Sequence, residues 1–449
     1  MDDRLLEKYG GPVPRYTSYP TAPQFSDAVG PAHYADWLQA LAPSDGPVSL
    51  YLHVPYCREL CTYCGCTTKI TRRYRPVFDY TKDLATEIDL VAAHLAEPMD
   101  VSHVHFGGGT PNILAPEDFR SLTGRLRKAF RFREDTEMAV EIDPRTLSVD
   151  MAEAMSAAGV TRVSLGVQDL NDRVQQVINR VQPLSVVSRA VSLLRVAGIR
   201  HVNLDLMYGL PLQTLEHVLH TVDRAAELGA DRVALFGYAH VPWMKKHQRL
   251  LDDLPRADAR ERLEHAEAAA RRLLDHGYKR IGFDHFAGPE DTLTRVAGDG
   301  TMRRNFQGYT TDTADVLLAF GASAIGQLPG GYVQNAPDTG SYHRLLAAGR
   351  LPTVKGVAID DEDRLRRGVI ERLMCDFAVD LDVFGGADAF RPELARLNAM
   401  ALDGLVRIEG GKIHVEDAAR PLVRAVAAVF DTYLTPPEAG AAQRHSIAV

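Results

Sequence analysis

The chain has 449 residues, of which 45% are apolar and 24% are charged, and its formal net charge is −8. This composition is typical of a soluble globular protein with two or three domains, and the negative charge argues against nucleic-acid binding, which relies on a basic surface. We expect a cytoplasmic protein, because no run of about 18 apolar residues predicts a membrane span, the N-terminus lacks a secretory signal, and the five cysteines do not form a disulfide framework.

The first 47 residues are rich in Pro, Tyr and Gly and show little regular pattern, so we predict an N-terminal arm. From residue 48 onward, apolar β-branched segments alternate with segments of helical periodicity. Strands are predicted at 48–54, 101–106, 137–142, 161–167, 200–206 and 231–238, and helices at 77–96, 116–130, 149–158, 184–197, 213–228 and 258–276.

This alternation predicts βαβ units and a parallel sheet. Gly159, Gly198 and Gly229 follow three of the helices at positions that suit a left-handed helix end. Six units fall short of the eight in a closed barrel. We therefore predict an α/β fold with a partial (β/α)6 parallel barrel, and an open doubly wound sheet is the alternative.

The remaining chain changes character twice. Residues 285–345 are rich in Gly, Thr and Asn, which predicts long loops with short elements, whereas 361–374 and 391–405 read as helices. Residues 405–415 then read as two short strands around a Gly-Gly turn, as in a winged-helix module. We predict an arm at 1–47, a barrel domain at 48–350, and a mainly helical C-terminal domain at 351–449 that packs on the barrel.

Four of the five cysteines lie within ten residues: Cys57, Cys61, Cys64 and Cys66. The first three are spaced C-x3-C-x2-C directly after the first predicted strand, where barrel active sites lie. Thiolates bind both zinc and iron–sulfur clusters, but a structural zinc site takes four protein ligands, usually in separated pairs, and only Cys375 is distant. The spacing favours a [4Fe–4S] cluster on Cys57, Cys61 and Cys64 with one iron left open; zinc is the alternative.

Glycines and polar groups follow the later predicted strands. The segment HFGGGTPN at 105–112 contains three consecutive glycines, which permit close backbone approach. Further groups lie at or beyond strand ends, or in the segment NRVQ: Glu141, Gln168, Asp205, the backbone of Ala239, and Arg180. Each of the first four alone is more often a helix cap or a buried polar group, and Arg180 alone is as readily a solvated helix arginine. Together, the first four line one rim of the barrel, where loops carry function.

The cysteine spacing after a first strand resembles the radical S-adenosylmethionine (SAM) superfamily, and GGGTP resembles the glycine-rich segment of that superfamily. The resemblance implies that SAM chelates the open iron through its amino and carboxylate groups. It also implies that one electron from the cluster cleaves SAM to methionine and a 5′-deoxyadenosyl radical.

A closer resemblance, to the oxygen-independent coproporphyrinogen III oxidase family, covers most of the chain. It is carried by PRYTSYPT (14–21), CGC (64–66), HFGGGTP, EIDPR, SLGVQD, NRVQ, NLDLMYGLP, YAHVP, DHFA (284–287), NFQGYTT (305–311) and YVQN (332–335). The family implies oxidative decarboxylation of the ring A and B propionates of coproporphyrinogen III to the vinyl groups of protoporphyrinogen IX, in porphyrin biosynthesis. It also implies a monomer and a low-potential electron donor such as a flavodoxin-type protein.

The family further implies two SAM molecules. By motif match, the first is faced by Tyr51, Gly108, Glu141 and Ile325, and the second by Tyr63, Gly109, Thr110, Gln168, Arg180, Asp205 and Ala239. Core packing is the alternative role for Tyr51 and Tyr63. Cys66 completes the C-x-C of the family; we expect it to exchange hydrogen near the radical centre rather than bind the cluster.

The substrate is a tetra-anion, so cations must bind it. Candidates by charge alone are Arg15 in the arm and, in later loops, Lys245, Lys246, Arg303 and Arg304. We expect the arm to cover the site and exclude water or oxygen. Two alternatives stay open: a related haem-binding chaperone, which would usually lack the full arm and the C-x-C, and a radical SAM enzyme acting on another tetrapyrrole.

Overall fold

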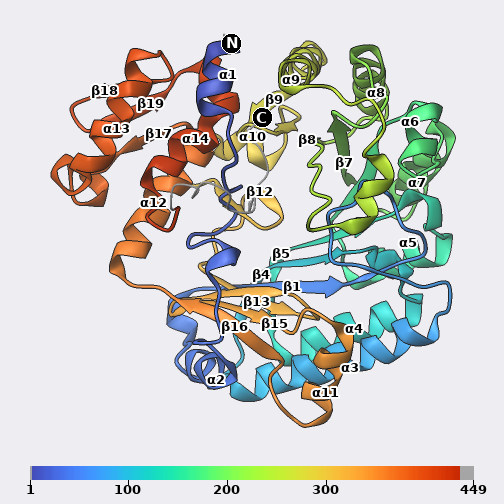
Figure 1. The fold of residues 1–449 in the computed structure, drawn as a ribbon. Coiled ribbons are helices and arrows are strands. Elements are labelled where there is room, and N and C mark those ends of the chain that lie inside the picture. Colours follow the sequence, from blue (N-terminus) through green and yellow to red (C-terminus); the bar gives the residue numbers. More distant parts are fainter. Residues whose placement is uncertain (1–2, 435–449) are drawn as a thin grey trace.

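The computed structural model describes residues 3–434 and is built around a twelve-stranded sheet (Figure 1). Six strands run parallel in the order β1-β4-β5-β6-β7-β8, and β13 pairs in parallel with the other edge of β1. Their bounds are β1 Val48–Val54, β4 Asp100–Gly108, β5 Arg131–Ile142, β6 Arg162–Gln168, β7 His201–Tyr208, β8 Arg232–Gly237 and β13 Val316–Phe320. All six predicted strands form, in the predicted parallel order.

The connecting helices cover the outer side of the curved sheet (Figure 1). They are α3 Arg75–His94, α4 Pro116–Ala129, α5 Val149–Ala158, α6 Asp172–Val177, α7 Leu184–Val196, α8 Leu215–Glu227 and α9 Ala259–Asp275. Within the described residues the edge strands of the sheet, β16 Thr353–Ala358 and β9 Lys279–Ile281, do not pair with each other. The predicted partial α/β barrel is therefore confirmed, and α6 is an additional short helix.

Local sequence explains where these helices begin and end. Ser148 accepts a hydrogen bond from the Met151 amide at the start of α5, and Gly159 ends the helix with a φ of 88°. Gly198 and Gly229 also have positive φ, at 94° and 68°. Glycine adopts this left-handed conformation without a side-chain clash, so each helix stops where the next strand must begin.

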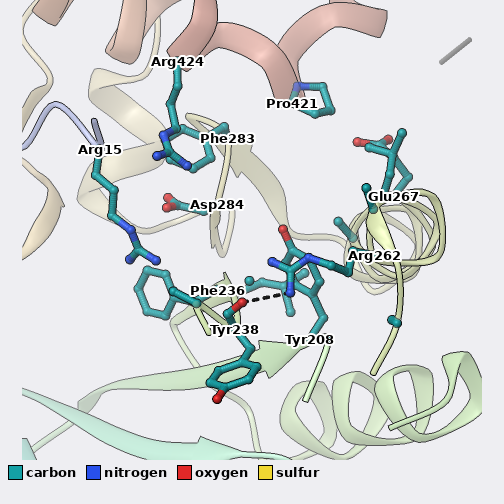
Figure 2. A pocket seen from close by; sticks show the side chains of 18 of the residues that line it. Arg15, Tyr208, Phe236, Tyr238, Arg262, Glu267, Phe283, Asp284, Pro421 and Arg424 are labelled. Carbon is teal, nitrogen blue, oxygen red and sulfur yellow. Dashed lines mark hydrogen bonds between the residues drawn. The ribbon is translucent and has the colours of Figure 1, made fainter. Parts of the chain in front are cut away.

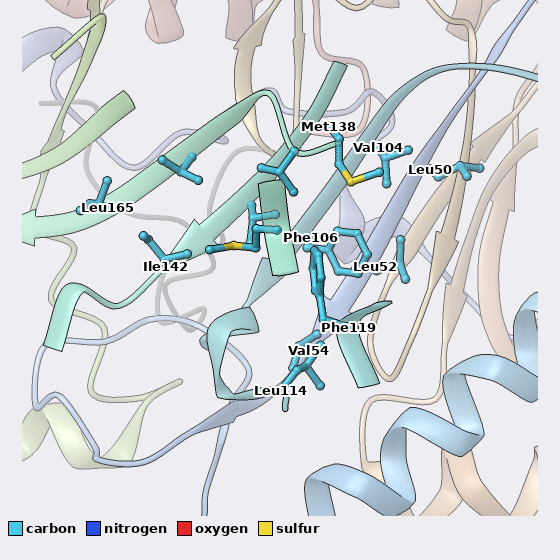
Figure 3. Packing of buried hydrophobic residues seen from close by; sticks show 14 of the residues in the cluster. Leu50, Leu52, Val54, Val104, Phe106, Leu114, Phe119, Met138, Ile142 and Leu165 are labelled. Carbon is cyan, nitrogen blue, oxygen red and sulfur yellow. The ribbon is translucent and has the colours of Figure 1, made fainter. Parts of the chain in front are cut away.

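The barrel core lies between the sheet and its helices (Figure 3). Leu50, Leu52 and Val54 on β1 are fully buried, as is Phe106 on β4. Phe106 packs against Phe119 on α4 with ring centroids 5.0 Å apart. In β1 and β4 apolar residues alternate with Ser, Tyr or His, so one face of each strand packs against the helices. The packed core fixes the strand ends that carry the polar groups.

Residues 279–358 contain more regular structure than the long loops predicted for much of this region. Antiparallel β9 Lys279–Ile281 and β10 His285–Ala287 extend one edge of the sheet, and β14 Ile325–Leu328, β15 Gly331–Asn335 and β16 Thr353–Ala358 extend the other beyond β13. The remaining elements are α10 Thr292–Val296, β11 Arg303–Asn305, β12 Gly308–Thr310 and α11 Thr339–Ala347. These strands were not predicted because each is short and is separated from the next by segments that contain Gly and Thr.

The C-terminal part has its own buried cluster, separate from the barrel core. It comprises α12 Asp361–Asp376, β17 Ala378–Asp380, α13 Arg391–Leu402, β18 Val406–Glu409, β19 Lys412–Val415 and α14 Val423–Ala427. Both predicted helices and the hairpin form, and β17 adds a third strand to the hairpin. The large sheet continues through β16 past residue 350, and residues 435–449 of the predicted domain lie outside the described residues.

The N-terminal arm contains two helices, α1 Asp3–Tyr9 and α2 Pro31–Gln39, although its sequence shows little regular pattern. Tyr16 and Tyr19 belong to the C-terminal cluster, and the Tyr16 hydroxyl donates to Asp431 at 3.1 Å. The arm therefore runs along the C-terminal part toward the barrel (Figure 1). No helix in residues 3–434 is long and apolar enough to cross a membrane.

Candidate active site

The predicted site groups lie at the carboxyl ends of the parallel strands. Six of them come from six successive strands or the residues just after them: Tyr51 on β1, Gly108 on β4, Glu141 on β5, Gln168 on β6, Asp205 on β7 and Ala239 after β8. Parallel strands place their carboxyl ends on one rim of a barrel. The fold therefore gathers groups that are nearly 190 residues apart in the chain, from Tyr51 to Ala239.

The cysteine loop follows β1 and is held at this rim from two sides. Cys57 lies on the short strand β2 Tyr56–Cys57, which pairs with β3 Lys69–Ile70. The Thr62 amide donates to the Ile178 carbonyl at 3.0 Å, and the Gln248 amide donates to the Tyr63 carbonyl at 2.7 Å. These anchors come from the segment after α6 and from the helical turn η5 Lys246–Leu251.

Each of the three expected ligand sulfurs has a polar neighbour that can donate to a thiolate. The contacts are Thr110 Oγ1 to Cys57 Sγ at 3.4 Å, Arg180 Nη1 to Cys61 Sγ at 3.6 Å, and the Cys66 amide to Cys64 Sγ at 3.4 Å. Such donors stabilise thiolate charge and tune a bound cluster. Within residues 3–434 no three His, Cys, Asp or Glu side chains are arranged for a single metal ion. The donor set fits an iron–sulfur cube, in which each thiolate binds a different iron.

Arg180 connects three groups of the rim, Cys61, Gly166 and Asp143. It donates through Nη2 to the Gly166 carbonyl at 2.7 Å and lies 3.6 Å from Asp143, while its buried Nε donates no hydrogen bond within the described residues. Arg145 donates to Asp143 at 2.7 Å and to Cys61 at 3.9 Å. Sequence analysis missed Asp143 and Arg145, although both lie in the EIDPR motif, because ion pairing between side chains is not visible in a linear pattern.

Glu141 joins β5 to the glycine-rich turn. It accepts a hydrogen bond from the Gly108 amide at 3.0 Å, and His105 Nε2 lies 3.0 Å from its other oxygen. The Tyr51 ring stacks on His105 with centroids 5.8 Å apart. Burial raises the pKa of Glu141, but the His105 and Gly108 contacts outweigh burial and hold it below its usual value. Glu141 is therefore an ionised hydrogen-bond acceptor at the rim.

The pKa of Asp205 is shifted in the opposite direction to that of Glu141. Burial and the nearby Glu141 raise its pKa to about 7, and Ser164 donates to it at 3.0 Å. Gln168 ends β6 with a φ of 67°, a strained conformation for a residue other than glycine. A Cβ on Gly166 would lie 2.8 Å from the side-chain nitrogen of Gln168, so an alanine there would require that side chain to move. The rim thus places a carboxylate, a titrating carboxyl and an amide side by side.

Gln248, which sequence analysis also missed, connects two predicted cofactor contacts. Its side-chain amide donates to the carbonyls of Tyr63 and Ala239 at 2.7 and 3.2 Å. Cys66 is exposed to solvent, and Lys245 donates to its carbonyl at 3.0 Å. The loop after β8 therefore covers the cysteine loop, and one side chain fixes their spacing.

Two predicted residues lie apart from these contacts. Ile325 begins β14 and packs against the cluster of Phe25 and Tyr332, so its role toward SAM stays a prediction. Arg303 is ion-paired with Glu371 at 3.0 Å, which favours a structural role over substrate binding.

The chain is 49% identical to the oxygen-independent coproporphyrinogen III oxidase of Bradyrhizobium diazoefficiens over 442 residues, which cover 97% of both chains. It is 38% identical to the enzyme of the same name from Escherichia coli over 440 residues, covering 96% of this chain and 95% of that one. The chain belongs to the oxygen-independent coproporphyrinogen III oxidase family. The predicted family is therefore confirmed.

The fold of this protein matches that of a solved member of this family. The solved structure of coproporphyrinogen III oxidase from Escherichia coli, described as a radical SAM enzyme, matches with a TM-score of 0.88 and 36% identity, covering 96% of this chain and 99% of that one. The radical SAM superfamily model matches residues 51–225. That span includes the cysteine loop, the glycine-rich turn, Glu141, Arg180 and Asp205, so most of the rim lies within the part of the chain that matches the superfamily model.

Proposed function

We propose that this protein catalyses the oxygen-independent oxidative decarboxylation of coproporphyrinogen III, in which the ring A and B propionates become the vinyl groups of protoporphyrinogen IX. The observation that carries the proposal is the cysteine loop at the barrel rim, where three thiols each meet a hydrogen-bond donor beside the strand-end carboxyls. Near-complete coverage by coproporphyrinogen III oxidases supports this substrate over other tetrapyrroles.

Cys57, Cys61 and Cys64 would hold a [4Fe–4S] cluster, whose open iron would bind SAM. When bound, these groups supply the one-electron chemistry that removes a hydrogen atom from an unactivated propionate carbon, which acid–base side chains cannot do. Loss of CO2 and transfer of one further electron to a one-electron acceptor would then form the vinyl group, so each propionate gives up a hydrogen atom and an electron, two electrons in all. The protein's task is to bind, orient and shield the reactants.

The rim residues suit that task. The ionised Glu141 and the backbone of Gly108 would face the amino and hydroxyl groups of the first SAM, together with Tyr51 and Ile325. For a second SAM we propose contacts from Tyr63, Gly109, Thr110, Gln168, Arg180, Asp205 and Ala239. The unused Nε donor of Arg180 suits a carboxylate, and Asp205 suits ribose hydroxyls.

Cys66 is proposed to act on hydrogen rather than on iron. Cys66 is exposed at the rim, where its thiol shares a hydrogen bond with the Cys64 side chain and its backbone amide donates to Cys64 Sγ at 3.4 Å. We also propose that the enzyme works as a cytoplasmic monomer that binds no nucleic acid and takes electrons from a low-potential donor of the flavodoxin type.

Anaerobic reconstitution followed by product analysis tests the proposal. The reconstituted protein is incubated with coproporphyrinogen III, SAM and a reductant, and we expect protoporphyrinogen IX, CO2 and 5′-deoxyadenosine. Cys57→Ser is the matched control and should form none of them. Tight haem binding without turnover would instead support the chaperone alternative and refute the oxidase.

A further inference from the structure

A cavity of about 400 Å3 opens between the barrel and the C-terminal part, next to the rim (Figure 2). Its floor is formed by the ends of β7 and β8, including Tyr208, Phe236 and Ala239. The arm, α9 and the C-terminal η8 Asp417–Leu422 and α14 supply the other walls. Ala239 belongs both to this lining and to the predicted cofactor contacts, so the cavity is adjacent to the rim.

Of the six arginines that line this cavity within the described residues, four come from well-separated parts of the chain. They are Arg15 in the arm, Arg262 on α9, Arg304 on β11 and Arg424 on α14. Figure 2 shows Arg15, Arg262 and Arg424 directed from different walls toward the region around Asp284. Such convergence from four segments of the fold differs from arginines scattered over a solvated surface.

Acidic groups in the lining do not balance these arginines. Glu267 is ion-paired with Arg280 at 2.9 Å, and Asp258 caps the start of α9. Asp284 lies 3.7 Å from Arg304 and 2.6 Å from the Nδ1 atom of His285. Asp284 is thus the acidic residue of the described lining that faces Arg15 and Arg304.

Several guanidinium donors in the cavity are unused. Arg304 is 5% exposed and stacks between Phe283 and Tyr309, and its Nε and Nη1 donate no hydrogen bond within the described residues. Arg262 donates to the Tyr238 carbonyl at 2.8 Å, but its buried Nε donates to nothing described. Buried donors without acceptors are costly, so a ligand that accepts from them would be bound strongly.

The mutual repulsion of these cations also indicates that the cavity binds an anion. Burial and the nearby Arg15 and Arg304 lower the pKa of Arg424 to about 9. Arg424 donates to the Val13 and Pro14 carbonyls, the latter at 3.0 Å, so it positions the arm that carries Arg15. An anion in the cavity would relieve the repulsion and hold the arm in place at the same time.

We propose that Arg15, Arg262, Arg304 and Arg424 form a carboxylate-binding site that holds the propionates not undergoing reaction, which rests on the function proposed above. Guanidinium groups pair with carboxylates through parallel hydrogen bonds. The aromatic side chains of Phe236, Phe283 and Phe286 in the same lining suit the pyrrole rings between those propionates. The site orients the tetrapyrrole so that the remaining propionate reaches the rim.

Arg15 gives the sharpest test, because its side chain is exposed in the cavity and donates no hydrogen bond within the described residues, so Arg15→Gln should fold normally. Binding is measured by fluorescence on the full-length reconstituted protein, with coproporphyrin III as the probe and its uncharged tetramethyl ester as the comparison. We expect Arg15→Gln to weaken coproporphyrin III binding by about tenfold, since a charge-assisted pair is lost. Arg15→Lys should fall between wild type and Arg15→Gln.

Arg200→Gln is the matched control, because Arg200 is exposed at the amino end of β7, away from the cavity. It should bind coproporphyrin III as the wild type does, and the ester should bind equally weakly to wild type and Arg15→Gln. Wild-type binding in both Arg15→Gln and Arg304→Gln would overturn the site even if turnover is intact. Arginine-dependent binding in a protein that yields no vinyl product would keep the site and refute the proposed reaction.

Discussion

Gly109→Ala should damage both the stability and the cluster of this protein. A Cβ added at Gly109 would lie 2.7 Å from the Tyr56 carbonyl oxygen, 2.8 Å from the Tyr56 amide and 2.9 Å from the Val54 carbonyl. All three neighbours are backbone atoms, so no flexible side chain can move aside. Overpacking of this kind costs about 1–3 kcal/mol of unfolding free energy. The strand that must shift carries Cys57, so the contact of Cys57 with Thr110 would lengthen.

Urea unfolding of the apo-protein, followed by circular dichroism, measures the stability, and iron and sulfide analysis measures the cluster. Gly124→Ala is the matched control: Gly124 lies within α4 with open space around its Cβ position, so alanine should add about 0.5–1 kcal/mol. A Gly109→Ala protein that unfolds at the wild-type urea concentration and retains full iron would refute the reasoning.

Three further predictions concern other parts of the molecule. Burial raises the pKa of Glu87 from 4.5 to about 7, so the folded protein holds a proton at this carboxyl where the unfolded chain has lost it. The unfolding free energy should therefore fall by about 3 kcal/mol as pH rises from below 4.5 to above 7. Urea titrations across that range should show this slope for the wild type but not for Glu87→Gln. Cys66→Ser should keep about four irons per chain, whereas Cys64→Ser should keep fewer than about one, and iron loss in Cys66→Ser would make Cys66 a ligand. Phe106→Ala should lower the unfolding free energy by about 3–5 kcal/mol, and an unchanged urea midpoint would contradict the packing against Phe119.

The barrel strands could be predicted from the sequence because apolar residues recur at alternate positions, as at Leu50, Leu52 and Val54 in residues 48–54. The short strand β13 was missed because the Gly- and Thr-rich segments on either side hide its five-residue apolar run. The helices of the arm were missed because α2 is held by contacts with α3 and β16, which a local pattern does not contain.

The site residues also divide into those that could be predicted from the sequence and those that could not. Strand-end polar groups such as Glu141 and Asp205 could be expected at one rim, because a parallel sheet brings its carboxyl ends together. Arg145 and Gln248 were not found, because each acts through contacts with loops that are distant in sequence. The substrate-binding arginines were only partly foreseen: Arg15 and Arg304 were candidates by charge, whereas Arg262 and Arg424 became visible only in the cavity.

The arm also determines when the site can close during synthesis. Tyr16 is among the first residues made, yet its partner Asp431 comes 415 residues later. At roughly 5–20 residues per second, the arm must wait about 20–80 s for this partner. The barrel and its cysteine loop are translated in the meantime, so the loop is accessible to iron delivery before the arm and the C-terminal part complete the cavity beside it. The closing contact thus sets an order of assembly in which metal loading can precede formation of the tetrapyrrole cavity.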